Sequence, residues 1–527
     1  MELDDLTNRL RRSADLVKGW GKTVLPNGKT LGEMLTFDSI PFWDVVAAEI
    51  ALYHVPKALS RSDDRLQRVI RSARTYLRAV EYLAVNGRNR FLAGNRPPAR
   101  SSEPVFLFLG FQPYIYRDTL QPIVRHMAGD EAIRCISLCE DLSSLRPYRS
   151  SDKEQFQSIW QHWNGDVKAC ANGLTNSLKN AVKELHDMGT LPRIMQDGRG
   201  SLWPRMKGVF DWLFFVYLPN FMKHYAISRH ILDKYRPEII FSPDVADPRT
   251  RVYCLAGRQR KIPTLEIQFG VYGQEAVEWQ FFIADRIAAW GERSRDTLLS
   301  HGVDAGKIFL TGAPRHDGMV SVDEAEVSGT RSALGIPGGP AMVLFASTYA
   351  SVYDQQDDPT LVDSVKRAVI RSAGSNGELR LVFKPHPLED VRAAKKIAEG
   401  YRNILFAERD DDIRRLIRAC DVFISLGTTA TLDAIIANKL TICPKLPGWG
   451  WSDLFVDSGA VLAPASLEEL QRCLKTAVPT RRKVLEDLEP ARQRFLKEWI
   501  FKADGQASSR IASLAREMVL ENRDGPE

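Results

Sequence analysis

The chain has 527 residues, of which 44% are hydrophobic and 26% are charged. This composition is typical of an ordinary globular protein and excludes a fibrous or disordered chain, while the length exceeds one core and predicts two domains with additional helical segments. The formal net charge of +6 is modest for this length, and we expect no nucleic-acid partner.

Export and membrane signals are not recognisable in the sequence. The first residues, MELDDLTNRLRRSADLVKGWG, place acids before bases and lack an apolar core, which argues against a secretory signal. No run of about eighteen uncharged apolar residues could form a membrane-spanning helix. We expect a cytoplasmic protein, with peripheral contact to the cytoplasmic face of the inner membrane as an alternative. The seven scattered cysteines lack metal-binding spacing, so we expect structural thiols and neither a metal nor a cofactor.

Residues 1–100 are predicted to form a helical extension that carries a basic segment. Between Lys57 and Arg100, eleven lysines or arginines stand against three acids. Such an excess of positive charge attracts nucleic acid, anionic lipid headgroups or a phosphorylated acceptor. The arginines of RLQRVIRSARTYLRAVEYL also recur at helical spacing opposite an apolar stripe, which is typical of a solvated helix face, and we favour that interpretation slightly.

A first series of strands and helices is predicted in residues 101–325. Short apolar runs such as PVFLFLG, EIIFSPD and PTLEIQFG alternate with helix-like segments, which predicts a parallel sheet covered on both faces. An aromatic-rich stretch at about 141–236 interrupts the series and is predicted to be a helical insertion. Its segment SLWPRMKGVFDWLFFVYLPNF could lie at a membrane interface, but Asp211 and Pro219 interrupt the apolar run and favour internal packing.

A second series of the same kind is predicted in residues 341–480, after a linker rich in Gly, Ser and Pro at 326–340. It contains the runs AMVLFAS, LRLVFKP, NILFAE, DVFISLG, LTICPK and GAVLAP. Residues 481–527 are predicted to be C-terminal helices. The sequence thus predicts an α/β protein with two doubly wound, Rossmann-like domains facing a cleft, where open α/β sheets bind ligands.

One strand of the second series ends in the rigid, charged motif KPHP. Lys384 and His386 follow a buried apolar run, and Pro385 and Pro387 restrict the backbone on both sides of the histidine. A single histidine at a strand end is more often a surface residue than a catalytic one. A cation and an imidazole held at the carboxyl edge of a sheet can also hydrogen-bond or protonate a phosphate oxygen.

Another strand of this series, in DVFISLGTTATLDAIIANK, ends at Ser425 and passes through Gly427 into a helix whose first turn carries Thr428 and Thr429. A helix N-terminus presents unpaired N–H groups and a partial positive charge, and the hydroxyls add hydrogen-bond donors. Taken alone, this segment is better explained by helix capping. Because both motifs would emerge at one sheet edge, we expect them to converge on one phosphate.

The order of KPHP and a strand ending in Ser-x-Gly-Thr-Thr resembles the HP and Ser/Thr motifs of bacterial capsule and surface-polysaccharide transferases of the GT-B class. This group includes polysialyltransferases, capsule Kdo transferases and CDP-glycerol glycerophosphotransferases. The segment RIAAWGERSRDTLLSHGVDAGKIFLTGAPRHD is similar to the end of the first domain in these enzymes and in UDP-GlcNAc 2-epimerases. The resemblance extends from about Arg236 to the C-terminus, and it implies donor-binding roles for Gly312 and Arg315.

The first domain departs from the resembled pattern at Phe269. Many relatives carry Gln-His-Gly where this chain reads IQFGVYG, so Gln268 is kept as an acceptor contact while the histidine is absent. We therefore look for a general base in the turn FSPDVADPR, where Asp244 could deprotonate an acceptor hydroxyl. Helix capping explains Asp247 before Pro248, and for Asp244 the turn and the base remain equal alternatives.

The stretch FAERDDD adds one further candidate. The resemblance implies that Glu408, at a strand end, binds a ribose hydroxyl of the donor. The acidic run at 410–412 is more simply explained as the start of a helix, where acids complement the helix dipole.

The resemblance implies an inverting, metal-independent glycosyltransferase that moves a glycosyl group, or alternatively a polyol-phosphate group, from a nucleotide-activated donor, with a CMP- or CDP-type donor favoured. The product would be a bacterial cell-surface polysaccharide, such as capsule or lipopolysaccharide, built on a glycan or lipid-linked glycan acceptor held by the first domain. Two alternatives stay open, namely a nucleotide-sugar 2-epimerase and a non-catalytic glycan-assembly partner with the same fold.

Overall fold

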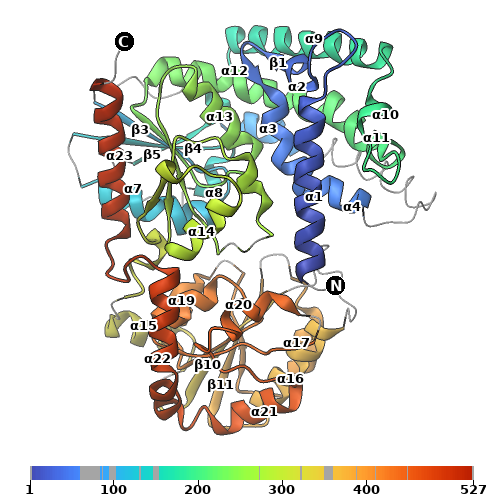
Figure 1. Ribbon diagram of the computed structural model, residues 1–527. Coiled ribbons are helices and arrows are strands. Elements are labelled where there is room, and N and C mark those ends of the chain that lie inside the picture. The colour runs from blue at the N-terminus through green and yellow to red at the C-terminus, as the bar shows by residue number, and fades with distance from the viewer. Residues whose placement is uncertain are drawn as a thin grey trace. The chain divides into compact units, whose positions relative to one another are not determined.

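The computed structural model describes residues 3–59, 84–85, 87–93, 103–129, 132–145, 154–271, 273, 275–320, 323–336, 338–348, 360–386, 389–409, 411–447 and 449–524. The chain divides into two compact units (Figure 1). The N-terminal unit comprises Thr7–Trp290, Ser294–Pro314 and Ser508–Glu527, and the C-terminal unit comprises Met1–Leu6, Gly291–Arg293 and Arg315–Ala507. Each unit contains a parallel α/β sheet, which confirms the prediction of two Rossmann-like domains.

The N-terminal unit contains a seven-stranded parallel sheet in the order β5-β4-β3-β6-β7-β8-β9. The strands are Val105–Leu109 (β3), Arg134–Cys139 (β4), Glu154–Ser158 (β5), Ile239–Ser242 (β6), Thr264–Ile267 (β7), Arg286–Ala289 (β8) and Ile308–Leu310 (β9). The strand order runs outward in both directions from the β3–β6 pair, which is the doubly wound pattern. Strands β3, β6 and β7 are buried along their whole length, as expected for a parallel sheet covered on both faces.

The helices around this sheet come from the middle and from the end of the chain. They are α6 (Pro113–Ile115), η2 (Tyr116–Leu120), α7 (Gln121–Met127), α8 (Leu142–Leu145), α13 (Pro248–Arg258), η6 (Val277–Phe281), α14 (Glu292–Ser300), η7 (Ala305–Lys307) and α23 (Ala507–Asp524). The terminal helix α23 lies beside the strands of this unit in Figure 1, and its residues Ile511, Ala515 and Met518 are part of the core that contains Phe106 and Phe241.

The N-terminal extension and the insertion add a mostly helical part to the same unit. The extension contains α1 (Leu3–Lys22), α2 (Leu31–Met34), the antiparallel pair β1 (Thr36–Phe37) and β2 (Ile40–Pro41), α3 (Phe42–Glu49), η1 (Ile50–His54) and α4 (Val55–Leu59). The insertion contains η4 (Ile159–His162), α9 (Gly165–Asp187), α10 (Leu191–Ile194), α11 (Trp203–Trp212), η5 (Leu213–Tyr217) and α12 (Leu218–Tyr235). Helix α12 packs against α9 and α13, so it connects the insertion to the sheet layer.

The insertion is not wholly helical, which corrects the prediction for 141–236. Residues Glu154–Ser158 form the edge strand β5 and pair in parallel with β4. The sequence of this strand, EQFQS, is mostly polar although much of it is buried, because its polar side chains have internal partners: Glu154 accepts a hydrogen bond from the Tyr116 hydroxyl, and the Ser158 hydroxyl donates to the Glu140 carbonyl. A search for apolar runs therefore could not find it.

The C-terminal unit contains a five-stranded parallel sheet in the order β12-β11-β10-β13-β14. The strands are Ala341–Ala346 (β10), Leu379–Lys384 (β11), Ile404–Phe406 (β12), Val422–Ser425 (β13) and Leu440–Ile442 (β14). The helices are η8 (Pro314–His316), α15 (Glu324–Ala333), α16 (Leu361–Gly374), α17 (Arg392–Ala398), α18 (Ile413–Ala419), α19 (Ala430–Ile436), η9 (Gly450–Ser452), α20 (Asp453–Val456), α21 (Leu467–Thr476) and α22 (Arg481–Trp499).

Several boundaries differ from the sequence-based expectation. The predicted linker at 326–340 includes most of helix α15, and the C-terminal unit already begins at Arg315. The run GAVLAP forms only an isolated bridge at Leu462, not a full strand. The predicted C-terminal helices divide between the units, since α22 belongs to the C-terminal unit and most of α23 to the N-terminal unit. Most of the basic segment between Lys57 and Arg100, and all of 60–83, lies outside the described residues.

Candidate functional site

Lys384 and Ser425 end neighbouring strands at the same edge of the C-terminal sheet. In the parallel register, Ala346 of β10 aligns with Lys384 of β11 on one side and with Ser425 of β13 on the other. The carboxyl ends of the three strands therefore lie in one row. The predicted placement of the two motifs at one sheet edge is confirmed, and this edge is where doubly wound sheets bind ligands.

The ammonium group of Lys384 is buried at this edge, with 6% of the residue exposed. Its Nζ donates a 2.7 Å hydrogen bond to the backbone oxygen of Arg409, in the loop after β12. The lysine therefore connects the ends of β11 and β12. It also brings a positive charge to this edge, and that charge would stabilise a bound anion.

Glu389 fixes the backbone around His386. One carboxylate oxygen accepts 2.8 Å bonds from the Ser347 hydroxyl and from Lys366 Nζ, and the other accepts a 3.0 Å bond from the backbone N–H of His386. The Arg409 guanidinium donates a 2.7 Å bond to the Glu389 carbonyl. Only 1% of Glu389 is exposed, so a buried side chain holds the backbone of His386 in place. Pro387, the second proline of the motif, lies outside the described residues.

Glu389 is not among the site residues predicted from the sequence. Its only sequence signal is its position three residues after His386, in the run HPLE. Its partners Ser347 and Lys366 come from the end of β10 and from α16, which the sequence does not show to be close.

The imidazole of His386 is half-buried. Burial lowers its pKa below the ordinary value, the nearby Glu389 carboxylate raises it, and the positive charge of Lys384 lowers it again. The net direction is downward, so the neutral form dominates at neutral pH. A neutral imidazole can donate a hydrogen bond to a phosphate oxygen, whereas proton transfer from an imidazolium is less accessible.

The turn from β13 into α19 contains the hydroxyl of Ser425, which has hydrogen-bond partners within the protein, and that of Thr428, which has none among the described residues. The Ser425 hydroxyl is buried, lies 2.6 Å from the Thr431 hydroxyl and accepts a 3.3 Å bond from the N–H of Gly427. Gly427 has a φ of 94°, which a residue with a side chain rarely adopts. The Thr428 Oγ1 is also shielded from solvent, but it finds no partner among the residues that the structure describes. A buried hydroxyl without a partner is a candidate ligand-binding group.

Helix capping does not account for the second threonine. Thr429 occupies the N-cap position of α19, but its side chain makes no capping hydrogen bond. The capping interpretation favoured for this segment is therefore not supported at Thr429. The assignment of Ser425, Gly427, Thr428 and Thr429 to donor binding stays a prediction, and for Ser425 the structure gives the hydroxyl internal partners.

Arg315 pairs with the buried carboxylate of Asp433, a residue of α19. Its Nε donates a 3.1 Å bond to Asp433, a second guanidinium nitrogen also bonds this carboxylate, and His316 Nε2 lies 3.1 Å from it. Although burial alone would raise the pKa of Asp433, the charge of Arg315 and the contact with His316 hold it well below the ordinary value. These contacts give Arg315 a role in holding α19. Its predicted contact with the donor stays a prediction.

The loop after β12 presents Glu408 at the surface. Glu408 is exposed, and its backbone N–H donates a 2.8 Å bond to the Asp411 carboxylate. Asp412 caps α18 by accepting a 3.0 Å bond from the N–H of Arg414, as expected for an acidic helix start, while Asp410 lies outside the described residues. Binding of a ribose by Glu408 stays a prediction.

In the N-terminal unit, Asp244 lies just after the carboxyl end of β6. Its carboxylate accepts a 2.8 Å bond from Gln112 Nε2 and a 2.9 Å bond from the N–H of Ala246. Asp247 caps α13 through the N–H of Arg249 at 2.8 Å, as the sequence predicted. Burial and then the neighbouring charge of Asp247 raise the pKa of Asp244 to about 6. A carboxylate with such a pKa can accept a proton near neutral pH.

Asp244 lines a cavity of about 320 Å³. The other lining residues are Glu49, Tyr53, Gln112, Tyr217, Phe221, Ala246, Asp247, Pro248 and Arg249. Glu49 ends α3 of the extension and accepts a hydrogen bond from the hydroxyl of Tyr217, which ends η5 of the insertion. The cavity thus lies at the carboxyl edge of the sheet, and the extension and the insertion, which both precede the segment with the resemblance, contribute to its wall.

Gln268 is engaged in internal bonds. Its Nε2 donates to the Gly270 carbonyl at 2.8 Å and to the Ser294 hydroxyl at 2.9 Å, and its Oε1 accepts a 2.8 Å bond from the N–H of Trp290. With 1% of the residue exposed, these contacts hold the loop after β7 against the end of β8. They give the predicted acceptor contact of Gln268 no support and indicate a structural role.

Gly312, which like Arg315 is a predicted donor-binding residue of the segment TGAPR, has a φ of 78°. The turn after β9 therefore requires a glycine, because other residues rarely adopt this conformation. Arg510 of α23 holds the same turn through a 2.7 Å bond from its Nε to the Thr311 carbonyl. Donor binding by Gly312 stays a prediction.

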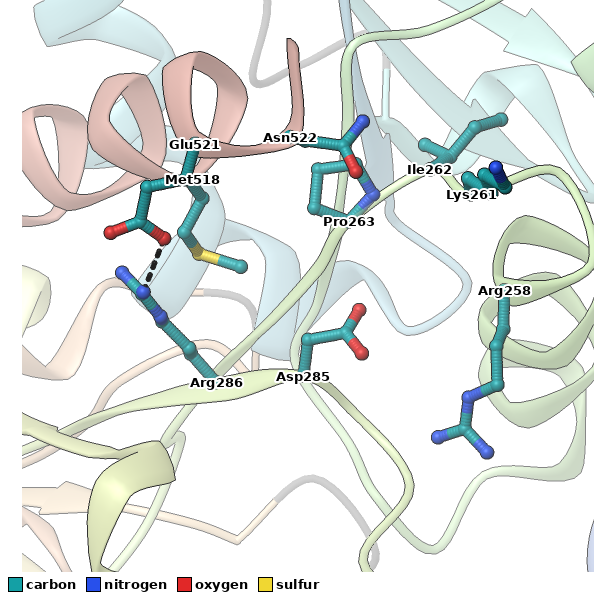
Figure 2. A pocket seen from close by; sticks show the side chains of 9 residues that line it. All are labelled: Arg258, Lys261, Ile262, Pro263, Asp285, Arg286, Met518, Glu521 and Asn522. Carbon is teal, nitrogen blue, oxygen red and sulfur yellow. Dashed lines mark hydrogen bonds and ion pairs between the residues drawn. The ribbon is translucent and has the colours of Figure 1, made fainter. Parts of the chain in front are cut away.

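A second cavity, of about 350 Å³, lies at the opposite edge of the N-terminal sheet (Figure 2). It is bordered by Pro263 before β7, by Asp285 and Arg286 at the start of β8, and by α23. Figure 2 shows the ion pair between Arg286 and Glu521, whose charged atoms lie 2.5 Å apart. Because the amino ends of the strands rarely form the active site of such a sheet, we assign the functional site to the other edge.

Among the described residues, no helix is both long enough and apolar enough to cross a membrane. The same part of the chain contains no group of three or more His, Cys, Asp or Glu side chains placed to hold a metal ion.

Residues 295–425 match the family model of CDP-glycerol:poly(glycerophosphate) glycerophosphotransferase. The matched segment includes Lys384, His386 and Glu389, and it ends at Ser425. The match, which covers about a quarter of the chain, confirms the resemblance to the surface-polymer transferases and supports the prediction of a glycosyltransferase. No protein in the curated set matches the sequence.

Solved structures with a similar chain fold cover most of the sequence at low identity. A variant of the wall teichoic acid polymerase TagF has 12% identity and a TM-score of 0.49, with 86% of this chain and 99% of that chain covered. MnaA from S. aureus, solved with UDP, has 16% identity and a TM-score of 0.48, with coverage of 78% and 94%. The UDP-GlcNAc 2-epimerase from Neisseria meningitidis, bound to UDP-GlcNAc, has 12% and 0.47, with coverage of 79% and 100%. At these identities and TM-scores, the likenesses assign no function to this chain.

Proposed function

We propose that the chain is an inverting, metal-independent glycosyltransferase that moves a sugar from a CMP- or CDP-activated donor to a bacterial surface glycan. The family match over 295–425 supports the choice of a transferase and of a cytidine-type donor. In this proposal the C-terminal unit binds the donor and the N-terminal unit binds the acceptor.

The observation that carries the donor part is the alignment of the KPHP and SLGTT strand ends in one row. Lys384 supplies a positive charge, and a neutral His386 and the Thr428 hydroxyl supply hydrogen bonds to the phosphate that leaves with the nucleotide. These interactions strengthen as negative charge develops on the leaving oxygen, so they favour the transition state over the bound donor. A cation and oriented donors can thus do the work for which other transferases use a metal ion.

Asp244 is the proposed general base. The acceptor oxygen attacks the anomeric carbon of the donor while the bond from that carbon to the phosphate oxygen breaks, and the electron pair of the broken bond leaves with the nucleotide. The acceptor proton passes to the Asp244 carboxylate. Attack from the face opposite the leaving group inverts the configuration at the anomeric carbon.

Nucleotide binding and release test this proposal. In a thermal-shift screen of the full chain with CMP, CDP, UDP and GDP, we expect a cytidine nucleotide to raise the melting temperature, since a ligand of the folded state stabilises it. With the matching nucleotide sugar, free nucleotide should accumulate only when an acceptor is added. Isomerisation of the sugar would instead indicate a 2-epimerase, and neither reaction nor binding would indicate a non-catalytic partner.

A cytoplasmic location and contact with the inner membrane through the basic segment also belong to this proposal. A lipid-linked acceptor would be met at that surface, where a cluster of lysines and arginines is attracted to anionic headgroups.

A further inference from the structure

We propose that the cavity beside Asp244 is a subsite for an uncharged sugar ring of the acceptor, and that it excludes phosphate-bearing acceptors. This inference rests on the proposed function, because it treats Asp244 as the base that faces the acceptor. It goes beyond that function by assigning the acceptor's chemical class and the parts of the chain that select it.

Three parts of the N-terminal unit form the cavity. The extension contributes Glu49 and Tyr53, the insertion contributes Tyr217 and Phe221, and the sheet edge contributes Gln112 and the turn from Asp244 to Arg249. The contact between Glu49 and the Tyr217 hydroxyl joins the first two parts. The volume of about 320 Å³ is at the lower end of the range for small-molecule sites, which suits one sugar unit better than a long polymer segment.

The aromatic side chains offer flat apolar surface next to polar groups. Tyr217 stacks on Trp212 with 4.0 Å between ring centroids and meets Phe221 edge-on at 4.6 Å, so its ring is held by packing. Tyr53 is 41% exposed and lines the cavity. A sugar ring has apolar C–H faces and a rim of hydroxyls, so it matches a wall of aromatic faces beside carboxylate and amide oxygens.

The charges in the cavity decide between a neutral and an anionic acceptor. Three carboxyl groups line it, those of Glu49, Asp244 and Asp247, against one guanidinium, that of Arg249. This guanidinium already binds Asp247 at 2.6 Å and Glu140 at 2.8 Å. A phosphodiester would therefore meet carboxylates without an uncommitted cation, whereas the hydroxyls of a neutral sugar can donate to them.

The ionisation behaviour of the lining carboxyls supports this reading of the cavity. Burial, together with the charges of Asp247 and Asp244, raises the pKa of Glu49, while the hydrogen bond from Tyr217 and the charge of Arg249 lower it, and the net result is a pKa of about 7. The lining carboxylates thus already repel one another, and a phosphate bound beside them would add to that repulsion. The acceptor class inferred in this way differs from the poly(glycerophosphate) named in the matched family.

Saturation-transfer NMR on the full chain tests the subsite directly. The probes are methyl β-glucoside, methyl β-galactoside, methyl β-N-acetylglucosaminide and glycerol 3-phosphate. We expect signal from at least one glycoside, an at least about fivefold loss of that signal in Tyr53→Ala, and no signal from glycerol 3-phosphate that depends on Tyr53. Phe215→Ala is the matched control, since Phe215 is an exposed aromatic residue of η5 that does not line the cavity.

Charge selection has its own variant. At pH 8, where Glu49 is mainly ionised, Glu49→Gln keeps the size of the side chain and the acceptor for the Tyr217 hydroxyl but removes a negative charge, so it should increase glycerol 3-phosphate binding relative to the glycosides. Glu521→Gln removes a carboxylate at the opposite sheet edge and should leave the ratio unchanged. Absence of signal from all glycosides, or a Tyr53-dependent signal from glycerol 3-phosphate in the unchanged protein, overturns the proposal.

The thermal-shift screen with nucleotides separates this inference from the proposed function. A chain that binds a glycoside through Tyr53 but shifts with no nucleotide keeps the subsite and loses the proposed transferase. A chain that is stabilised by a cytidine nucleotide and transfers sugar, but whose glycoside signal is unchanged in Tyr53→Ala, keeps the transferase and loses the subsite.

Discussion

At the scale of single residues, the KPHP motif supplies His386, the proposed phosphate contact, and Glu389 after it holds the backbone of that histidine. One oxygen of Glu389 accepts a hydrogen bond from the backbone of His386 and the other accepts from Ser347 and Lys366, so the position of His386 depends on a buried carboxylate with internal partners. The backbone N–H of His386 is therefore held by a buried carboxylate before a donor binds, which reduces the ordering needed on binding.

The first prediction concerns His386. Replacing it with alanine should lower kcat by about 10²-fold, the range seen for loss of one oxyanion-type donor, because its hydrogen bond strengthens as the phosphate leaves. Steady-state rates with saturating donor measure this effect, and circular dichroism checks the fold. Normal turnover of a folded His386→Ala variant would mean that the imidazole does not contact the leaving group.

The second prediction concerns Glu389→Gln. The amide keeps the shape but leaves the buried Lys366 ammonium with only the exposed Asp363 carboxylate, 3.5 Å away, as a charged partner, so the unfolding free energy should fall by about 1–3 kcal/mol and kcat should also fall. Because Glu389 acts through His386, the double variant with His386→Ala should be little slower than His386→Ala alone. Fully additive effects on kcat would show that Glu389 supports the fold without positioning the histidine.

The third prediction follows from the pKa of Glu49, raised by burial from 4.5 to about 7. The folded state binds this proton more tightly than the unfolded state, so the stability that Glu49 contributes is complete below pH 4.5 and is lost as the pH rises through about 7. Glu49→Gln should remove this loss and gain on the order of 2 kcal/mol over the parent at pH 8, with little difference at pH 4. Urea unfolding of both proteins at the two pH values measures it, and a gap that widens toward low pH would contradict the assignment.

Sequence reasoning found residues of suitable chemistry but could not see which of them were already paired. Lys384 and His386 were recognisable because a charged residue and a histidine stand at the end of a buried apolar strand. Ser425 and Gln268 were equally suitable by type, yet their polar groups bond Thr431 and Trp290 inside the protein. Such pairing depends on contacts between distant segments, which one sequence does not reveal.

At the scale of elements, the turn from β13 into α19 is the part of the proposed donor site that helix capping does not explain. A fourth prediction is that changing Thr428 and Thr429 together to Val keeps their shape but weakens donor binding by about tenfold, through loss of two hydroxyl donors. The donor KM should rise while the acceptor KM is unchanged.

Thr476→Val is the control for this pair, because it alters an exposed threonine of α21 in the same unit. If the double variant raised both KM values equally, or if the control had the same effect, the two threonines would be structural residues of the helix start.

The elements themselves were largely predictable where burial on both faces imposes a continuous apolar run. Strands β3, β6, β10 and β13 are of this kind. The edge strand β5 was missed because its sequence is polar, and the run at 459–464 was overestimated because apolar residues can also pack in a loop. Helix α15 was read as a linker because its glycine and serines are weak helix formers, although Asp323 caps its start.

At the scale of the whole molecule, each unit has a core of its own. Phe106, Phe241 and Ile511 belong to one core, and Phe345 and Phe383 belong to another. The core of the N-terminal unit is completed by α23, the last helix of the chain, so this unit requires residues from both ends of the sequence. Units with separate cores can unfold in separate steps.

The last prediction uses this separation. Ile511 is fully buried in the core of the N-terminal unit, so Ile511→Ala should lower the unfolding free energy of that unit by about 2–5 kcal/mol, from lost burial and the cavity left behind. A cytidine nucleotide should raise the melting temperature of the other unit, which holds the KPHP and SLGTT edges. Differential scanning calorimetry should then show two transitions, with the substitution moving one and the nucleotide moving the other. As the matched control, Ile370→Ala, in α16 of the C-terminal core, should move the transition that nucleotide also moves. If Ile511→Ala and nucleotide shifted the same transition, the assignment of donor binding to the C-terminal unit would be wrong.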